Sequence, residues 1–124
     1  MRILLDTHIL LWWLAAEPLR DDAREAISNP RSTVFVSAAS AWEISIKRSL
    51  GKLKAPDDLE KQLRRHRFMP LSVTIRDGLL AGALVDLHPD PFDRILVAQA
   101  LNESLTVATR DERIHAHRVQ TLAA

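Results

Sequence analysis

The sequence predicts an α/β fold in which a central, mainly parallel sheet of four to five strands is flanked by helices. Short runs of β-branched and leucine residues without polar alternation, such as Ile3–Leu5, are typical of strands buried on both faces. These runs alternate with longer helix-like segments, as expected when helices cover both faces of one sheet. The length of 124 residues is that of one domain, so we expect a single domain over residues 1–124.

Stop and start signals set the boundaries of the elements in the first half of the chain. Pro18 ends the first helix, and Asn29-Pro30 ends the second, because a residue that precedes proline disfavours the helical conformation. Ser37 is placed to cap the third helix, and Gly51 is placed to end it. The predicted elements are strand 2–6, helix 8–16, helix 19–28, strand 33–36, helix 38–50 and helix 57–66.

The second half continues the same alternation. The turn Leu87–Pro91 leads into a helix for which Asp90 is a candidate cap and Pro91 a favourable first residue. The apolar run Leu105–Ala108 then predicts a buried strand. The predicted elements are strand 69–73, helix 74–84, helix 92–103, strand 105–108, a short helix around 111–115 and an edge strand 119–122.

The composition excludes several classes of protein. Hydrophobic residues make up 47% and charged residues 27%, with a net charge of +1, so the chain is not a generic polycation. The absence of cysteine excludes a disulfide scaffold, a thiolate zinc site and a cysteine nucleophile. The longest apolar run, Ile9–Ala16, is far shorter than the ~20 residues of a membrane span. Because Asp6 and His8 also interrupt any signal-peptide pattern, we expect a cytoplasmic protein without a membrane partner.

Four acidic residues lie at chemically conspicuous positions: Asp6, Asp93 and Asp111 where predicted elements begin or end, and Glu43 inside a helix. Asp6 ends the first strand, Asp111 follows the strand-like run that ends at Thr109, and Asp93 lies in the first turn of its helix. Glu43 lies one to two turns into the helix that follows the second strand, within reach of the same edge. In an alternating α/β chain these positions gather at one edge of the sheet, where ligands bind.

Each acid also has a plain structural explanation. Asp6 and Asp93 suit the starts of helices, Asp111 suits a turn or cap, and Glu43 can pair with Lys47 four residues later on a solvated surface. Independent capping does not explain why all four should converge. Carboxylates gathered at one edge repel each other unless a hard cation lies between them, so the pattern predicts a magnesium site and phosphate chemistry.

Four sequence motifs resemble those of PIN-domain ribonucleases, in particular the VapC-like toxin branch. The motifs are Leu4–Trp12, Val36–Ile44, Asp90–Ala100 and Thr109–Asp111. Together they span almost the whole chain in the family's order. The resemblance implies a PIN-like three-layer sandwich, a metal-dependent endoribonuclease and the toxin half of a toxin–antitoxin pair. It also implies a homodimer and a cognate antitoxin that blocks the site, often with a basic side chain.

The resemblance also implies roles for individual residues. The catalytic and metal-binding set carried over by position is Asp6, Glu43, Asp93 and Asp111. The candidate supporting residues near the metal are Thr7, Ser37, Asp90 and Thr109. Asp90 is interpreted first as a helix cap. Among the acids, Asp6 and Asp93 are the expected metal ligands, Glu43 orients water or binds a second metal, and Asp111 is the most dispensable.

These residue types suit phosphodiester hydrolysis. Mg²⁺ prefers oxygen ligands and keeps several waters, so a few carboxylates and the substrate phosphate complete its shell, and Mn²⁺ can substitute for it. We expect in-line attack by water, which leaves a 5′-phosphate and a 3′-hydroxyl. Single-stranded or looped RNA is the expected substrate, because an A-form duplex hides its base edges. The sequence leaves the RNA target and the number of metals open.

A basic stretch between Lys47 and Arg67 is the candidate surface for RNA. It contains eight Lys and Arg residues against three acidic ones, and such a local surface attracts polyanions even when the whole chain is near neutral. The residues selected as candidate RNA contacts are Lys52, Lys54, Arg64 and Arg65. A solvated helix face, a dimer contact and an antitoxin contact remain alternatives for the same stretch.

Two other interpretations of the whole chain fit the sequence less well. A phosphoacceptor receiver domain needs paired acids after the first strand and a lysine near the last core strand, whereas Thr7 follows Asp6 and the last lysine is Lys61. A catalytically silent PIN-like module that binds RNA or protein is the more serious alternative, and the complete acidic set argues against it. His115 and His117 are interpreted as surface histidines rather than as part of a zinc site.

Overall fold

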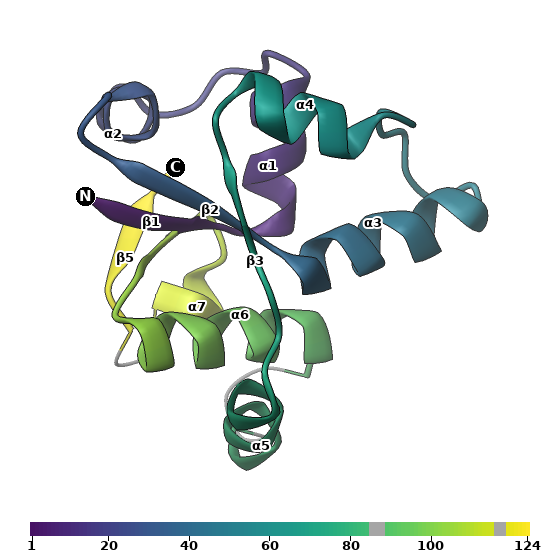
Figure 1. Ribbon diagram of the computed structural model, residues 1–124, viewed down its shortest axis with the longest axis vertical. Helices are drawn as coiled ribbons and strands as arrows, with labels where there is room; N and C mark the ends of the chain where they lie inside the picture. Colours follow the sequence, from purple (N-terminus) through teal and green to yellow (C-terminus); the bar gives the residue numbers. More distant parts are fainter. Residues whose placement is uncertain (85–88, 116–118) are drawn as a thin grey trace.

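The computed structural model of the protein describes residues 1–84, 89–115 and 119–124 (Figure 1). Within these ranges the strands and helices alternate as the sequence predicts. In chain order they are β1 Arg2–Leu5, α1 Thr7–Leu14, α2 Asp21–Ser28, β2 Thr33–Ser37, α3 Ala38–Ser49, α4 Leu59–Arg65, β3 Met69–Leu71, α5 Ile75–Ala83, α6 Pro91–Glu103, β4 Thr106–Thr109, α7 Glu112–His115 and β5 Thr121–Ala123.

The five strands form one parallel sheet in the order β3-β2-β1-β4-β5. The central strand β1 aligns Ile3 with Val34 of β2 on one side and with Thr106 of β4 on the other. This sheet confirms the predicted fold class. From β1 the chain builds the sheet outward through β2 and β3, and then returns to add β4 and β5 on the other side of β1. The strand order therefore reverses between β1 and β4, the place where open α/β sheets bind ligands.

Alternate residues of the central strands face opposite layers of helices. Ile3 and Leu5 belong to a core cluster with Ile9 of α1 and Ile27 of α2. Leu4 instead packs in a second cluster, with the α6 residues Leu96, Val97 and Ala100 and with Ile114 of α7. Figure 1 shows α1, α2 and α4 above the sheet and α5, α6 and α7 below it. Because both faces are covered, the central strands are mostly apolar on both faces, which is why they lack polar alternation in the sequence.

The starts of α3 and α6 are fixed by the caps that the sequence predicts. The Ser37 hydroxyl accepts a hydrogen bond from the Ala39 amide and caps α3. The Asp90 carboxylate accepts from the Phe92 amide and caps α6, in which Pro91 occupies the first turn. These caps place Asp93 in the first turn of α6, on the helix that packs below β1 and β4.

Several boundaries differ from the predicted ones: α1 ends at Leu14 rather than at residue 16, α2 begins at Asp21 rather than at residue 19, and both edge strands differ as well. β3 contains only Met69–Leu71 of the predicted 69–73, and β5 begins at Thr121 rather than at residue 119. Edge strands pair on one side only, so few hydrogen bonds fix where they end. Part of the predicted turn 87–91 lies outside the described residues. In the described part of the chain no helix is both long and apolar enough to cross a membrane.

Candidate active site

Asp6 lies at the carboxyl end of β1, where the strand order reverses. It is the N-cap of α1, and its Oδ1 accepts a hydrogen bond from the Ile9 amide at 2.8 Å. Its backbone amide donates to the carbonyl of Ala108 in β4, which holds the two strand ends together. Only 5% of the residue is exposed. The cap interpretation is therefore correct, but capping alone does not account for a carboxylate this deeply buried.

The electrostatic surroundings of Asp6 disfavour its charge in the metal-free protein. Burial raises the pKa of the Asp6 carboxyl above its ordinary value. Hydrogen bonds from Thr109 and from the Ile9 amide, together with the nearby His8, oppose this rise in pKa, and the negative charge of Asp111 adds to it. The pKa remains raised overall. A cation placed beside Asp6 would remove most of this cost, which is the behaviour expected of a metal ligand.

Thr109 connects Asp6 to Asp111. The Thr109 side chain is fully buried at the end of β4, and its hydroxyl donates to Asp6 Oδ2 at 2.5 Å. The same hydroxyl accepts a hydrogen bond from the Asp111 amide at 3.0 Å. Asp111 is half-buried, and its Oδ1 accepts from the Arg113 amide at 2.9 Å. One threonine therefore fixes both a buried carboxylate and the turn that carries a second one.

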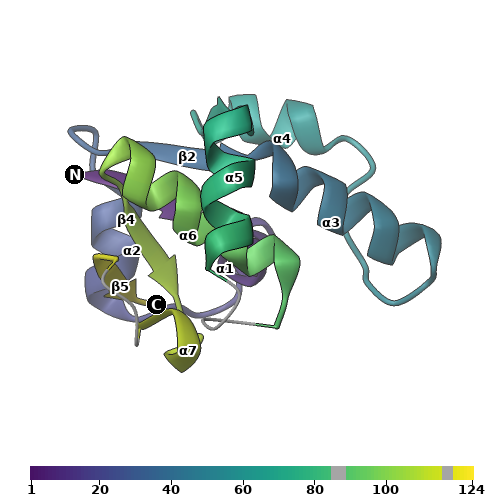
Figure 2. The same ribbon diagram turned by 90° about the horizontal axis from the view of Figure 1, so that it is seen from below.

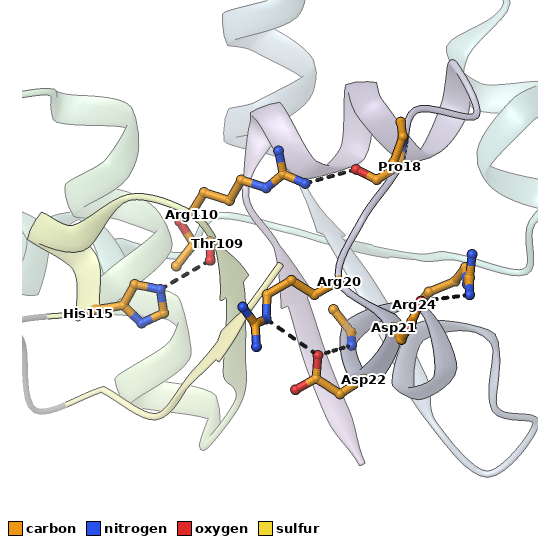
Figure 3. Close-up of polar contacts among 9 residues, drawn as sticks. Pro18, Arg20, Asp21, Asp22, Arg24, Thr109, Arg110 and His115 are labelled. Carbon is orange, nitrogen blue, oxygen red and sulfur yellow. Dashed lines mark hydrogen bonds and ion pairs between the residues drawn. The ribbon is translucent and has the colours of Figure 1, made fainter.

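The end of β4 is held in place by two further side chains, which Figure 3 shows on either side of Thr109. His115 Nε2 donates to the Thr109 carbonyl at 3.1 Å, and its Nδ1 lies 2.6 Å from the hydroxyl of Thr121. Arg110 donates to the Pro18 carbonyl at 2.8 Å and covers the Trp12 ring. His115 is half-buried, and both of its ring nitrogens have partners in the fold. His117 lies outside the described residues.

Glu43 approaches the same edge from the second turn of α3. It is only 2% exposed, so a solvated surface pair with Lys47 is not its environment. The Thr7 hydroxyl donates to Glu43 Oε1 at 2.7 Å, and Ser40 lies 3.0 Å from that hydroxyl. The ammonium of Lys47 donates to Glu43 Oε2 at 2.6 Å. Ser40 and Lys47 were missed as site residues, although the spacing of Glu43 and Lys47 already indicated their pairing.

Lys47 also connects Glu43 to the start of α6. The hydrogen bond to Glu43 raises the pKa of the Lys47 ammonium, and the negative charges of Glu43, Asp90 and Asp93 raise it further. Asp90 and Asp93, both half-buried, thus lie close enough to act on a cation that is bound to Glu43. The α3 and α6 acids therefore share one electrostatic environment.

The four predicted acids form two groups that meet at the start of α1. One group is Asp6, Thr109 and Asp111, and the other contains Glu43, Lys47 and Asp93. They join because Asp6 and Thr7 are consecutive: the first contacts Thr109 and the second contacts Glu43. Among the described residues, no three His, Asp or Glu side chains are close enough together to hold a metal ion.

The donor chemistry of these residues nevertheless suits a hard divalent cation. Every candidate ligand is a carboxylate, and there is no cysteine in the chain. Asp6 is buried, and the negative charge of Asp111 repels it. Glu43 is also buried, and it is paired with the positive charge of Lys47. A divalent cation between the two groups would offset both the burial and the repulsion. The residues therefore fit Mg²⁺ or Mn²⁺ by charge and ligand type.

Two of the predicted supporting residues, Ser37 and Asp90, cap helices, whereas the candidate RNA contacts lie in another part of the chain. Ser37 is buried at the end of β2 and caps α3, while Asp90 caps α6. The candidate RNA contacts are all exposed and lie in the segment after α3 and at the end of α4, which leads into β3 (Figure 1). These residues are Lys52, Lys54, Arg64 and Arg65.

Comparisons with known proteins agree with this architecture. The chain is 29% identical over 126 residues to Ribonuclease VapC22 of Mycobacterium tuberculosis, covering 94% of this chain and 92% of that protein. Its fold matches a chain of VapBC2 from Rickettsia felis, solved bound to promoter DNA, with a TM-score of 0.72, 16% identity and 98% coverage of both chains. It also matches a chain of a toxin–antitoxin complex from Klebsiella pneumoniae, with a TM-score of 0.69, 17% identity and coverage of 98% and 96%.

The family assignment rests on a match along nearly the whole chain. The profile of the PIN domain family matches residues 3–120, from β1 to the segment before β5. This range contains all four acids at the carboxyl edge of the sheet. The chain therefore belongs to the PIN domain family.

Proposed function

We propose that the chain is a metal-dependent endoribonuclease that hydrolyses phosphodiester bonds in RNA and acts as the toxin of a toxin–antitoxin pair. The observation that carries the proposal is the pair of buried carboxylates, Asp6 and Glu43, each held by a threonine hydroxyl where the strand order reverses. Burying a carboxylate is costly even when hydrogen bonds or an ion pair compensate it, and buried acids of this kind cluster at functional sites. The similarity to a mycobacterial protein named as a ribonuclease supports RNA as the substrate.

The residues that would hold the metal are Asp6, Glu43, Asp93 and Asp111. Their oxygen-only chemistry favours Mg²⁺, with Mn²⁺ as a substitute. When bound, the cation neutralises charge on the phosphate and makes water a better nucleophile. We infer that Asp6 and Asp93 contribute most to binding, because Asp6 is the buried acid with a raised pKa, and Asp93 lies in the first turn of α6, close enough to act on Lys47.

The chain's own side chains fix the geometry of hydrolysis. Thr109 holds one oxygen of Asp6, and Thr7 holds one oxygen of Glu43. The second oxygen of each carboxylate has its own partner, which is the Ile9 amide for Asp6 and the Lys47 ammonium for Glu43. Both threonines are buried, which keeps their hydroxyls from rotating freely. Because these side chains are already ordered in the folded protein, no further entropy is lost to position them when the reaction occurs.

Replacing Asp93 with Asn tests the proposal directly. The amide keeps the size of the side chain but removes its charge, so we expect RNA cleavage in Mg²⁺ to fall by at least about 100-fold. The measurement is cleavage of an RNA mixture by purified protein, with sequencing of the products from cells that express either form. Glu103→Gln, at the far end of α6, is the matched control. Equal cleavage by wild type and Asp93→Asn would refute the assignment.

The alternative of a catalytically silent PIN-like binding module makes a different prediction for metal. A calorimetric titration with Mn²⁺ separates the two, because a silent scaffold has no need of the cation. If the protein binds RNA but binds no Mn²⁺ at millimolar concentration, the binding module becomes the better interpretation.

We further propose that the exposed basic residues after α3 and in α4 contact the RNA backbone. Reversing the charge of Lys52, Lys54, Arg64 and Arg65 together should weaken RNA binding and flatten its dependence on salt, because fewer counterions are released. The measurement is the binding constant across a series of salt concentrations. An unchanged affinity and salt slope would assign the stretch to a protein contact instead.

A cognate antitoxin, a homodimer and a cytoplasmic location complete the proposal. Exposed apolar side chains support a protein contact: Ile75 and Leu79 lie one turn apart on α5, and they are 84% and 73% exposed. Trp42 and Val73 line a cavity of about 500 Å³ between α3 and α6. Apolar surface of this kind marks interaction sites, and a second copy of the chain is the occupant that we propose. Sedimentation equilibrium measures the stoichiometry, and a monomer would contradict the homodimer.

A further inference from the structure

Lys47 occupies an unusual position among the acids. Its ammonium lies 2.6 Å from Glu43 Oε2, and the Lys47 side chain is 39% exposed while that of Glu43 is 3% exposed. A pair of this spacing on a helix surface normally has both partners in water. Here the acid is fixed inside the protein by Thr7, whereas the base reaches in from the solvent. The lysine can therefore leave without any movement of the glutamate.

The charges around Lys47 come from two helices. Glu43 belongs to α3, as does Lys47 itself, and Asp90 and Asp93 belong to the start of α6, which packs against α3. The Lys47 ammonium thus contacts the carboxylate of Glu43, and the charges of two carboxylates at the start of α6 also act on it. A divalent cation held by Glu43 and Asp93 would occupy the same surroundings. Two cations cannot both occupy them without strong repulsion.

We propose that Lys47 is a built-in counter-cation of the acid site, which competes with the divalent metal for Glu43. This inference rests on the proposed metal-dependent function. Without metal, the ammonium balances the buried Glu43 and the α6 acids, so that α3 and α6 can pack with their carboxylates close together. When metal binds, the flexible lysine moves toward solvent and its charge is replaced. Lys47 is thus a positioning residue that sets how tightly metal binds.

The test compares metal affinity in Lys47→Met, Lys47→Arg and wild type by calorimetric titration with Mn²⁺. Removing the competing charge should tighten Mn²⁺ binding by about fivefold or more. Even in water, the repulsion between adjacent unit charges changes a binding constant by about that factor. Lys47→Arg keeps the charge and should bind Mn²⁺ no more tightly than wild type. The matched control is Lys61→Met, which removes an exposed charge from α4. Its affinity for Mn²⁺ should equal that of wild type.

A second readout does not depend on catalysis. In the absence of metal, Lys47→Met should melt at a lower temperature than wild type, because Glu43 then lies buried without its partner. Saturating Mn²⁺ should narrow this difference, since the metal replaces the lost charge. Should Lys47→Met fail to fold, Lys47→Gln retains a hydrogen-bond donor for Glu43 and takes its place in both measurements.

Three outcomes would overturn the inference. Equal or weaker Mn²⁺ binding by the uncharged variants means that Lys47 only orients Glu43. A melting difference that Mn²⁺ leaves unchanged means that the pair is a purely structural contact. If wild type itself binds no Mn²⁺, the proposed metal-dependent function fails and the competition fails with it. The first two outcomes leave the proposed function standing, so the two failures are distinguishable.

Discussion

Asp6→Asn should abolish RNA cleavage and at the same time make the metal-free protein more stable at neutral pH. The asparagine still caps α1, because Asn and Asp are about equally good N-caps, and its amide can still hydrogen-bond to Thr109. What it removes is the charge, which is disfavoured by burial and by the repulsion of Asp111. We expect the melting temperature to rise, because each ~1 kcal/mol of added stability raises it by roughly 4 °C in a domain of this size.

The pH dependence of this stabilisation follows from the raised pKa of Asp6. Folded protein binds the Asp6 proton more tightly than unfolded protein does, so wild type loses stability as pH rises from the unfolded pKa of 3.8 through the folded pKa. The increase in stability that Asp6→Asn gives should therefore be full at neutral pH and small below the pKa of Asp6 in the unfolded protein. Thermal denaturation of both proteins from pH 3 to pH 7 without metal measures this difference.

In the presence of magnesium, wild type should be more stable than Asp6→Asn, the reverse of their order without metal. Metal that binds only the folded state raises the melting temperature of wild type, and the neutral asparagine should lose most of that effect. The matched control is Asp22→Asn, an exposed acid in α2 far from the carboxyl edge of β1. The assignment of Asp6 would be refuted if Asp6→Asn cleaves RNA normally, or if it is less stable than wild type at neutral pH without metal.

Thr109→Val should both destabilise the fold and shift the pH dependence of cleavage. Valine has nearly the same shape, but it can neither donate to Asp6 nor accept from the Asp111 amide. Because Thr109 is fully buried, water cannot easily replace these bonds, and we expect a loss of about 1–3 kcal/mol in the free energy of unfolding. Denaturant titration measures this loss.

The shift in the pH profile has a defined sign. The Thr109 hydrogen bond lowers the pKa of Asp6, so its removal should raise that pKa further. The acid limb of the cleavage profile should then move to higher pH in Thr109→Val. Thr109→Ser keeps the hydroxyl and is the matched control, with an unchanged pH profile. In an Asp6→Asn background the valine should cost less stability, because the two residues interact directly. Full additivity of the two substitutions would contradict their coupling.

Local signals in the sequence were sufficient for most of the fold. Ser37 and Asp90 cap the helices that they were expected to cap, because a cap acts on amides only two residues away. The unalternating runs in β1 and β4 correctly indicated strands buried on both faces. The short edge strand β5 was less well placed, since its ends depend on pairing with one neighbour only.

The candidate site could be predicted as a set of residues but not as a geometry. The acids were selected because strand ends and helix starts share one edge in this topology, and their role as metal ligands stays a prediction. Glu43 shows the limit: its spacing from Lys47 is the same for a surface pair as for a buried one, and only packing distinguishes them. His115 shows the same limit, because its partners Thr109 and Thr121 come from neighbouring strands of the folded sheet.

The sequence by itself determined the parallel α/β fold, the caps and the order of the four acids, because each depends on residue type and short-range spacing. The tertiary structure alone decided which groups touch. Thr109 reaches Asp6 across 103 residues of sequence, and Thr7 reaches Glu43 across 36. Such contacts depend on how strands and helices pack and which side-chain conformations the packing allows. No short-range pattern in the sequence predicts these contacts. They are what brings two buried carboxylates and one lysine together as a candidate active site.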